Sequence, residues 1–263
     1  MNKFTKAIAA IMLIVAAIIV TGCNKPDEPN NGGNNNGQND SIVNPNDNGG
    51  NNNGQNDSIV DHSGTLNGHD YVDLGLPSGT FWANCNVGAN TPEGYGDYYA
   101  WGETQPKTTY DWNNYIWSNG NGRQLTKYCS KAEYGYYGYS DNLTNLLPSD
   151  DVATTKWGYG WRTPTAEEWD ELCQNTSNHW IIQNGVNGWL FTASNGNSIF
   201  LPSAGYRLDD DLFDAGGYGG YWSSSLDIVY PRDAWDFSFG SGLYENILDR
   251  RNGRSIRAVH SAE

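Results

Sequence analysis

Only one stretch of this chain carries a clear helix signal, and that scarcity limits the folds open to it. Residues 165–173 begin with a capping box, because Thr165 is followed three residues later by Glu168. Three apolar side chains of this stretch share one face of the expected helix: Trp169, Leu172 and Cys173. A second, shorter helix is expected over residues 149–157. The rest of the domain is therefore expected to consist of strands and turns.

Short strands separated by turns account for most of the remaining pattern. Trp235, Phe237 and Phe239 alternate with Asp236 and Ser238, which is the period of a half-buried strand. The 32 Gly and 11 Trp of the chain are typical of a loop-rich domain with an aromatic core. Further strands are expected at residues 71–74, 81–83, 98–101, 189–191, 199–201, 221–223 and 255–259. The expected fold class is α+β, with two helices, a small antiparallel sheet and long loops.

The same alternation predicts which side chains are buried. The core is expected to include five residues of the last third of the chain: Trp222, Trp235, Phe237, Phe239 and Ile256. Arg257 lies on an expected strand and is predicted to be a buried partner in a structural ion pair. Three cysteines follow residue 62, so at most one disulfide is expected among Cys85, Cys129 and Cys173.

Charge narrows the possible partners. A formal net charge of −15 argues against nucleic acid, because phosphates demand clustered Lys and Arg. No Cys and His residues have the spacing of a zinc site, and we expect neither a metal nor a cofactor. Asp209, Asp210 and Asp211 offer the oxygen ligands that calcium prefers. A run of acids in an exposed loop is the preferred interpretation of these three residues.

The first 22 residues are predicted to be a targeting segment. Lys3 and Lys6 precede an apolar stretch, residues 7–20, that is too short for a comfortable membrane span. Residues 20–23 read Val-Thr-Gly-Cys and resemble the lipobox of bacterial lipoproteins. The resemblance implies cleavage before Cys23 and lipidation of that residue, which would anchor the protein in a membrane. The alternative is an ordinary signal peptide with a chance cysteine.

Residues 23–62 are predicted to be a disordered tether rich in Asn and Gly. Residues 31–43 read NGGNNNGQNDSIV, and residues 48–60 repeat these 13 residues without change. The repeat has almost no apolar residues to bury, so it predicts a flexible spacer with a reach of roughly 30–40 Å. Each copy contains Asp-Ser-Ile, which resembles an O-glycosylation acceptor of secreted Bacteroides-type proteins. Ser41 and Ser58 are the expected acceptors, and plain spacer sequence is the alternative.

The folded part, residues 63–263, resembles a known domain family through motifs that occur in order. Residues 69–104, 157–172 (WGYGWRTPTAEEWDEL), 203–207, 219–225 and 252–259 are similar to the Fibrobacter succinogenes major paralogous domain. That family is similar in fold to C-type lectins, in the branch that includes formylglycine-generating enzymes. The resemblance implies a C-type lectin-like fold, with two helices, a small twisted sheet and loops displayed on one side.

The chain departs from the chemistry of this fold branch. Formylglycine-generating enzymes use cysteines late in the chain, whereas no cysteine follows Cys173 here. Calcium-dependent lectins use a Glu-Pro-Asn motif, and residues 28–30 carry it only in the tether. A binding role without chemistry is therefore expected, and an enzyme is a rival because acid pairs are plentiful. The sequence does not place any of those acid groups together.

Two irregular segments interrupt the regular frame near the C-terminus. Residues 226–233 (LDIVYPRD) and 243–251 (LYENILDRR) have neither a helical nor a strand period. The fold branch also includes variable proteins of diversity-generating retroelements, in which copying errors at adenines randomise Asn codons. A codon that is randomised at its first two positions and ends in a pyrimidine cannot encode Trp, Met, Lys, Gln or Glu. None of these five residues occurs at the irregular positions, provided that Glu245 is a fixed position. A fixed binding surface at the same place is the preferred alternative.

The sequence thus predicts a ligand-binding face within residues 206–251. Its proposed contact residues combine aromatic bulk with hydrogen-bonding groups: Tyr230, Arg232, Asp236, Ser238, Tyr244, Asn246, Asp249 and Arg250. The expected protein is an outer-membrane lipoprotein that faces the cell exterior and binds an unidentified protein or glycan. A fixed glycan-binding module, with exposed Trp and Tyr stacking on sugars, is the alternative.

Overall fold

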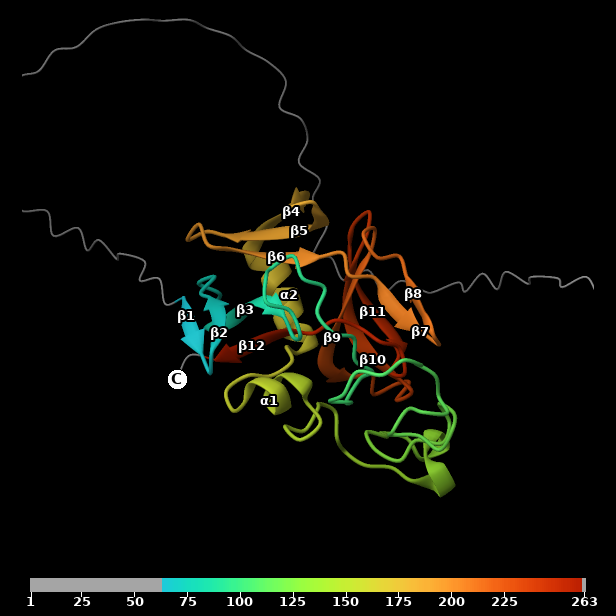
Figure 1. Cartoon of the computed structure of the whole chain (residues 1–263). Coiled ribbons are helices and arrows are strands. Elements are labelled where there is room, and N and C mark those ends of the chain that lie inside the picture. The colour runs from blue at the N-terminus through green and yellow to red at the C-terminus, as the bar shows by residue number, and fades with distance from the viewer. Residues whose placement is uncertain (1–62, 262–263) are drawn as a thin grey trace, which may run out of the picture.

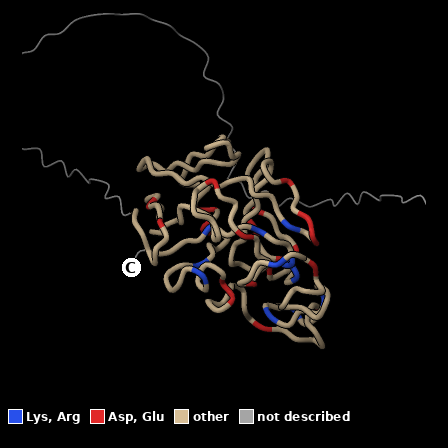
Figure 2. The backbone as a smooth tube through the Cα atoms, viewed as in Figure 1, with Lys and Arg blue, Asp and Glu red and all other residues tan. Residues whose placement is uncertain are grey.

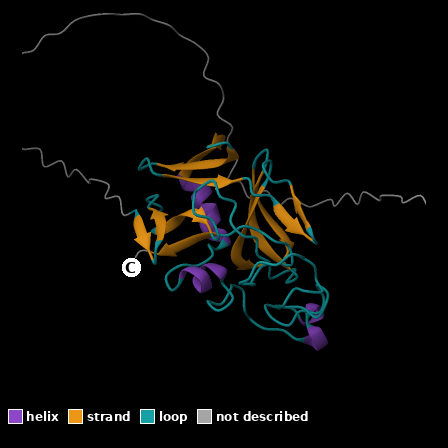
Figure 3. Ribbon diagram, in the orientation of Figure 1, coloured by secondary structure: helices purple, strands orange, loops and turns teal. Residues whose placement is uncertain are grey.

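The computed structural model describes residues 63–261 (Figure 1). The predicted signal peptide (residues 1–22), the predicted tether (residues 23–62), and with it Cys23, Ser41 and Ser58, lie outside the described residues. The described part contains two α-helices and four small antiparallel sheets, which agrees with the α+β class (Figure 3). The expectation of one small sheet is wrong, because the strands are divided among four separate hydrogen-bonded groups.

A four-stranded sheet contains both ends of the described chain. Its order is β1 (Gly64–Leu66), β2 (His69–Val72), β3 (Thr80–Asn86) and β12 (Arg257–Ser261). All three strand pairs are antiparallel. The first and last described strands are therefore its two edges, on the left of the view in Figure 1.

The two helices lie where local signals predict them. Helix α1 (Val152–Trp157) begins three residues later than expected, because the Asp151 side chain caps it by accepting from two backbone N–H groups. Helix α2 (Ala166–Asn175) has the predicted capping box and buries the predicted apolar face. Two short 3₁₀ turns, η1 (Ala132–Tyr134) and η2 (Tyr136–Gly138), interrupt the long loop before α1. Within residues 63–261, no helix has the length and apolar character needed to cross a membrane.

A three-stranded sheet follows α2 directly. Its strands run in the order β4 (Thr176–Gln183), β5 (Val186–Ala193) and β6 (Ser198–Pro202). Asn184 and Gly185 join β4 to β5 with φ values of 48° and 85°, which is the positive-φ pair that a tight hairpin turn requires. The sequence did not predict β4, because the apolar residues of TSNHWIIQ are consecutive and do not alternate with polar ones.

The last third of the chain forms a second three-stranded sheet and a small hairpin. Strand β10 (Asp233–Phe239) lies between β9 (Gly219–Leu226) and β11 (Leu243–Asp249). The hairpin consists of β7 (Tyr206–Leu208) and β8 (Asp211–Phe213). Strand β11 contradicts the interpretation of residues 243–251 as irregular, since Leu243–Asp249 pairs with β10 along its whole length.

The main core lies where α2 packs against β9 and β10. The Trp169 ring stacks on Phe237 with 4.6 Å between ring centroids, and it lies 4.7 Å from Trp82 of β3. Four of the five predicted core residues are buried: Trp222, Phe237, Phe239 and Ile256. Trp235 is only half-buried, because its cross-strand neighbour toward the edge of the sheet is the exposed Ile247.

Two further expectations need correction, and a third observation concerns the cysteines. Residues 98–101 do not form a strand; their backbone is held by an isolated bridge between Tyr99 and Arg254 and by a hydrogen bond from Trp101 N–H to the Arg250 carbonyl. Arg257 is fully buried, but its guanidinium donates to four carbonyl oxygens rather than to an acid: Ala83, Asn84, Phe200 and the side chain of Asn86. Within the described residues, no disulfide joins any of the three cysteines.

Candidate functional site

One face of the β9–β10–β11 sheet holds half of the predicted ligand-binding residues. Strand pairing sets Asp236 opposite Asn246 and Ser238 opposite Tyr244. Because side chains alternate across a strand, these four lie on the face opposite to Phe237, which packs in the main core. The structure thus brings Asp236, Ser238, Tyr244 and Asn246 onto one face, which we call the outer face.

A second layer covers the β10 residues of the outer face. Arg254, from the segment between β11 and β12, places its Nε 3.6 Å from the Asp236 carboxylate. Gly220 permits this approach, since a Cβ there would lie 2.5 Å from the Arg254 guanidinium. Asp236 and Ser238 are consequently buried, and the prediction that they contact a ligand directly is wrong.

Two tyrosines complete this covering layer. The Arg254 guanidinium carbon lies 4.6 Å from the Tyr206 ring and 5.6 Å from the Tyr218 ring. The contacts have the geometry of cation–π interactions, which are strongest where the cation has lost its water. Backbone hydrogen bonds between Arg207 and Gly253 fix β7 beside the same segment. The β7–β8 hairpin therefore lies next to the outer face, as Figure 1 shows.

Asp236 is held in an unusual electrostatic environment. Burial raises the pKa of Asp236 to about 7, and the positive charge of Arg254 only partly opposes this shift. Neither carboxylate oxygen of Asp236 accepts a hydrogen bond from any described residue. Burial likewise raises the pKa of Tyr218, and the nearby Asp236 adds to this shift. The layer beneath the surface thus places a buried carboxyl, whose ionisation is disfavoured, beside the Arg254 guanidinium.

Tyr244 and Asn246 are the exposed members of the outer face. The Asn246 side chain donates to the Ser238 hydroxyl across 2.6 Å, so its amide is positioned by the buried layer. Tyr244 lies two residues before Asn246, on the same face of β11, and 47% of its surface is exposed. These two side chains can contact a ligand without any rearrangement of β11.

A row of acidic and basic side chains in alternation borders the outer face. Arg251 contacts Asp209 at 3.2 Å and Asp249 at 3.3 Å, and Asp249 also accepts from Arg232. Arg232 lies 3.5 Å from Asp233, which completes the sequence Asp209–Arg251–Asp249–Arg232–Asp233. Burial, with help from the neighbouring Asp249, raises the pKa of Asp233 to about 7. The predicted contact residues Arg232 and Asp249 are therefore already bound to each other.

The other two predicted residues have different positions. Tyr230 is 49% exposed in the turn between β9 and β10, beside the exposed Ile228 and Val229. Arg250 is fully buried and donates to the backbone carbonyls of Lys127 and Tyr128. The prediction that Arg250 binds a ligand is wrong, because it ties the end of β11 to the long loop.

The three consecutive acids at 209–211 diverge at the tip of the β7–β8 hairpin. Asp209 pairs with Arg251, whereas Asp210 accepts a hydrogen bond from Thr109 at 2.5 Å. Across residues 63–261, no group of three or more His, Cys, Asp and Glu side chains is placed to hold a metal ion. The expected exposed acidic run agrees with this arrangement, since all three residues are exposed.

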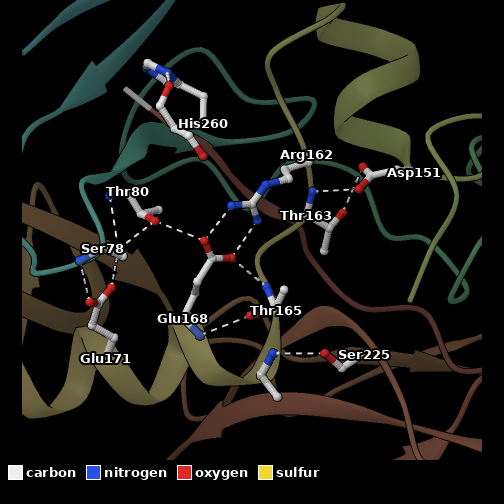
Figure 4. Close-up of polar contacts among 12 residues, drawn as sticks. Ser78, Thr80, Asp151, Arg162, Thr163, Thr165, Glu168, Glu171, Ser225 and His260 are labelled. Carbon is white, nitrogen blue, oxygen red and sulfur yellow. Dashed lines mark hydrogen bonds and ion pairs between the residues drawn. The ribbon is translucent and has the colours of Figure 1, made fainter. Parts of the chain in front are cut away.

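A cleft of about 200 Å³ opens elsewhere, beside the N-terminus of α2. Arg162 lies on its wall and donates both terminal nitrogens to Glu168, as Figure 4 shows. Asp151 also lines the cleft and is engaged by Thr163 and by the start of α1. The charged groups of this cleft are thus already bound, Arg162 to Glu168 of α2 and Asp151 to Thr163 and the start of α1, and we assign the cleft no ligand.

Sequence reasoning missed Arg254, Tyr206, Tyr218 and Arg251. Arg254 falls within residues 252–259, which belong to the regular frame, and its two tyrosine partners, Tyr206 and Tyr218, lie more than 30 positions away in the sequence. No period or spacing signals such a contact.

Comparisons with protein families, with curated proteins and with solved structures found no match to this chain.

Proposed function

We propose that this chain is a lipid-anchored, surface-facing binding protein with one C-type lectin-like domain. The lipobox-like residues before Cys23 support the anchor, and the ordered motifs between 69 and 259 support the domain assignment. Four antiparallel sheets with two helices and long loops are compatible with it. The protein binds a protein or glycan ligand outside the outer membrane and performs no chemistry on it.

The observation that carries the proposal is the pair Tyr244 and Asn246 above a buried polar layer. An aromatic ring and an amide, both exposed and held on a paired strand, lose little conformational freedom when a ligand binds. Asn246 is already oriented by Ser238. Neutral, aromatic and amide groups of this kind suit sugar rings as well as peptide surfaces.

The raised pKa values near this face do not require an enzyme. Asp236 is sealed beneath Arg254, and Asp233 is engaged with Arg232. A catalytic acid must come within hydrogen-bond reach of its substrate. Burial accounts for the raised pKa of Asp236, and burial together with the neighbouring Asp249 accounts for that of Asp233, so a purely structural origin is sufficient.

Binding arrays with matched variants test this function. The chain from residue 23, with Cys23→Ser, would be applied to arrays of glycans and of purified extracellular proteins. We expect a hit whose signal falls at least tenfold in Tyr244→Ala and in Asn246→Ala, as for an interface anchor. The control is Tyr159→Ala, which removes a tyrosine that is 93% exposed in the loop after α1. Hits that are insensitive to both variants, or an absence of hits, would contradict the proposal.

Diversification of this surface is the second candidate, and the burial pattern favours it. Every residue of β9 is buried, whereas the turn after it exposes Ile228, Val229 and Tyr230. The regular strand β9 is thus interior, and the middle of the irregular segment 226–233 is exterior. Sequencing of the 3′ end of the gene across a cell population should show variation at residues 228–230, 244 and 246. Codons for the buried Asp236, Ser238 and Arg250 should stay fixed, and a uniform population would refute diversification.

A further inference from the structure

Strand β4 has a long free edge. It pairs with β5 over all eight residues, without a bulge or a shift of register. It is the end strand of its sheet, and its other edge pairs with no strand among residues 63–261. Figure 1 shows it at the outermost side of this sheet. A row of backbone N–H and C=O groups is therefore available for a further strand.

The whole sheet that contains β4 carries no charged side chain. Residues 174–206 contain no Asp, Glu, Lys or Arg, although the chain has 15 basic and 30 acidic residues. Figure 2 shows this region without charged positions. Strand β4 itself reads TSNHWIIQ, with Ile182 70% exposed and Trp180 partly exposed. Proteins usually protect such edges with Lys, Pro or a bulge, and β4 has none of these.

Other end strands of the described sheets are protected. Strands β1 and β8 have three residues each, and β11 carries Glu245 and Asp249. The outer edge of β9 is bridged to Ser255, and that of β12 to Arg162. The exposed edge of β4 thus differs from these edges in combining length, regularity and neutrality.

We propose that β4 pairs antiparallel with β4 of a second copy of this chain and forms a two-fold symmetric dimer. A second copy is the fitting partner because the chain is strongly acidic, so two copies repel each other at charged surfaces and not at this neutral sheet. A two-fold contact uses the same edge on both copies and closes the assembly at two.

Strand geometry restricts how the two edges meet. Opposite residues in an antiparallel pair share a face, so the two-fold axis must pass between one residue and the same residue of the other copy, which face each other directly. Near the middle of β4, that residue is His179 or Trp180. Trp180 then faces either Asn178 or its own copy, and the apolar Ile182 becomes partly covered in both cases.

Sedimentation velocity with a charged variant tests the dimer. Every element of the fold lies after residue 63, so the chain from residue 23 with Cys23→Ser retains all of them. We expect a concentration-dependent dimer whose dissociation constant rises at least tenfold in Ile182→Lys, which places two lysines at the shared edge. Ile116→Lys is the control, because Ile116 is 56% exposed in a loop outside this sheet. A monomer at all concentrations, larger open-ended assemblies, or a dimer unaffected by Ile182→Lys would each overturn the proposal.

Cysteine cross-linking tests the register independently. Opposite Cα atoms of an antiparallel pair are about 4.5–5.5 Å apart, which a disulfide can span. His179→Cys and Trp180→Cys would be oxidised separately, with Ile116→Cys as the control. We expect one of the two β4 variants to form a covalent dimer rapidly and the control to remain monomeric. Equal cross-linking of the control, or none in either β4 variant, would refute strand pairing.

Discussion

Arg257→Met is expected to lower the free energy of unfolding by at least about 3 kcal/mol. The substitution keeps an unbranched side chain but removes the guanidinium, which leaves four carbonyl oxygens without their donor, at about 1 kcal/mol or more each. These oxygens belong to β3 and β6, so Arg257 on β12 joins the four-stranded sheet to the β4–β5–β6 sheet. Urea unfolding followed by tryptophan fluorescence would measure the loss.

Two further variants separate the guanidinium's geometry from its charge. Arg257→Lys keeps the positive charge, but one ammonium group cannot reach oxygens on two sheets as the planar fork does. We therefore expect it to lose most of the same stability. Arg123→Met is the control, because Arg123 is exposed and the change should stay within about 0.5 kcal/mol. A loss below about 1 kcal/mol for Arg257→Met would show that the carbonyl oxygens are satisfied in another way.

Stability should fall as the pH rises from about 4.5 to about 7. The pKa values of Asp233, Asp236 and Glu245 are each raised to about 7, chiefly by burial. In the unfolded chain these acids ionise near pH 4. Between the two values the folded state binds more protons, so a rising pH favours unfolding. We expect a loss of about 3–5 kcal/mol, mostly from the fully buried Asp236, because solvent screens the other two.

Acidic residues whose pKa is lowered in the folded state change the stability in a different, lower pH range. Although burial alone would raise it, the pKa of Glu168 is lowered by its hydrogen bonds and ion pair with Arg162. The stability that Glu168 contributes is complete above pH 4.5 and is lost only on further acidification. Stability is therefore expected to be greatest near pH 4.5–5.

Glu245→Gln isolates one contribution to the pH effect. Glu245 lies near the like-charged Asp170 and Glu167, and Gln mimics its protonated form. The variant should match the parent near pH 4.5 and exceed its stability near pH 7.5. Glu133→Gln, at an exposed position, should show no such change. Urea unfolding at both pH values would measure the difference in stability. Equal stability of parent and variant near pH 7.5 would contradict the claim that ionised Glu245 destabilises the folded state.

The fold was predictable where short-range signals determine it. The capping box at Thr165 and Glu168 defines α2 locally, and the alternation in residues 235–239 defines β10. Strand β11 was not recognised because polar residues occupy both of its faces; its partner strand supplies the order. Residues 98–101 have a buried aromatic pattern without a ladder, since packing and single hydrogen bonds hold them.

The site was harder to predict than the fold, for a physical reason. A period of two shows that Asp236 and Phe237 lie on opposite faces of a strand, but not whether a further layer covers the polar face. Arg254 and Tyr206 supply that layer from distant parts of the chain. Arg250 illustrates the same limit, because its partners belong to a loop more than 120 positions away. Exposed residues such as Tyr244 and Tyr230 needed no such information.

The position of β1 has a mechanical consequence. A pull on the chain ahead of Gly64 enters the fold through a three-residue strand that pairs with β2 alone. Because the β1–β2 hairpin is at an edge, it can be peeled open one residue pair at a time, without shearing the sheets around α2. Strand β11, which carries Tyr244 and Asn246 of the outer face, lies on the opposite side of the domain from β1 in Figure 1. Tension on the leading segment would therefore lengthen the chain first and leave the outer face intact, as the proposed binding role requires.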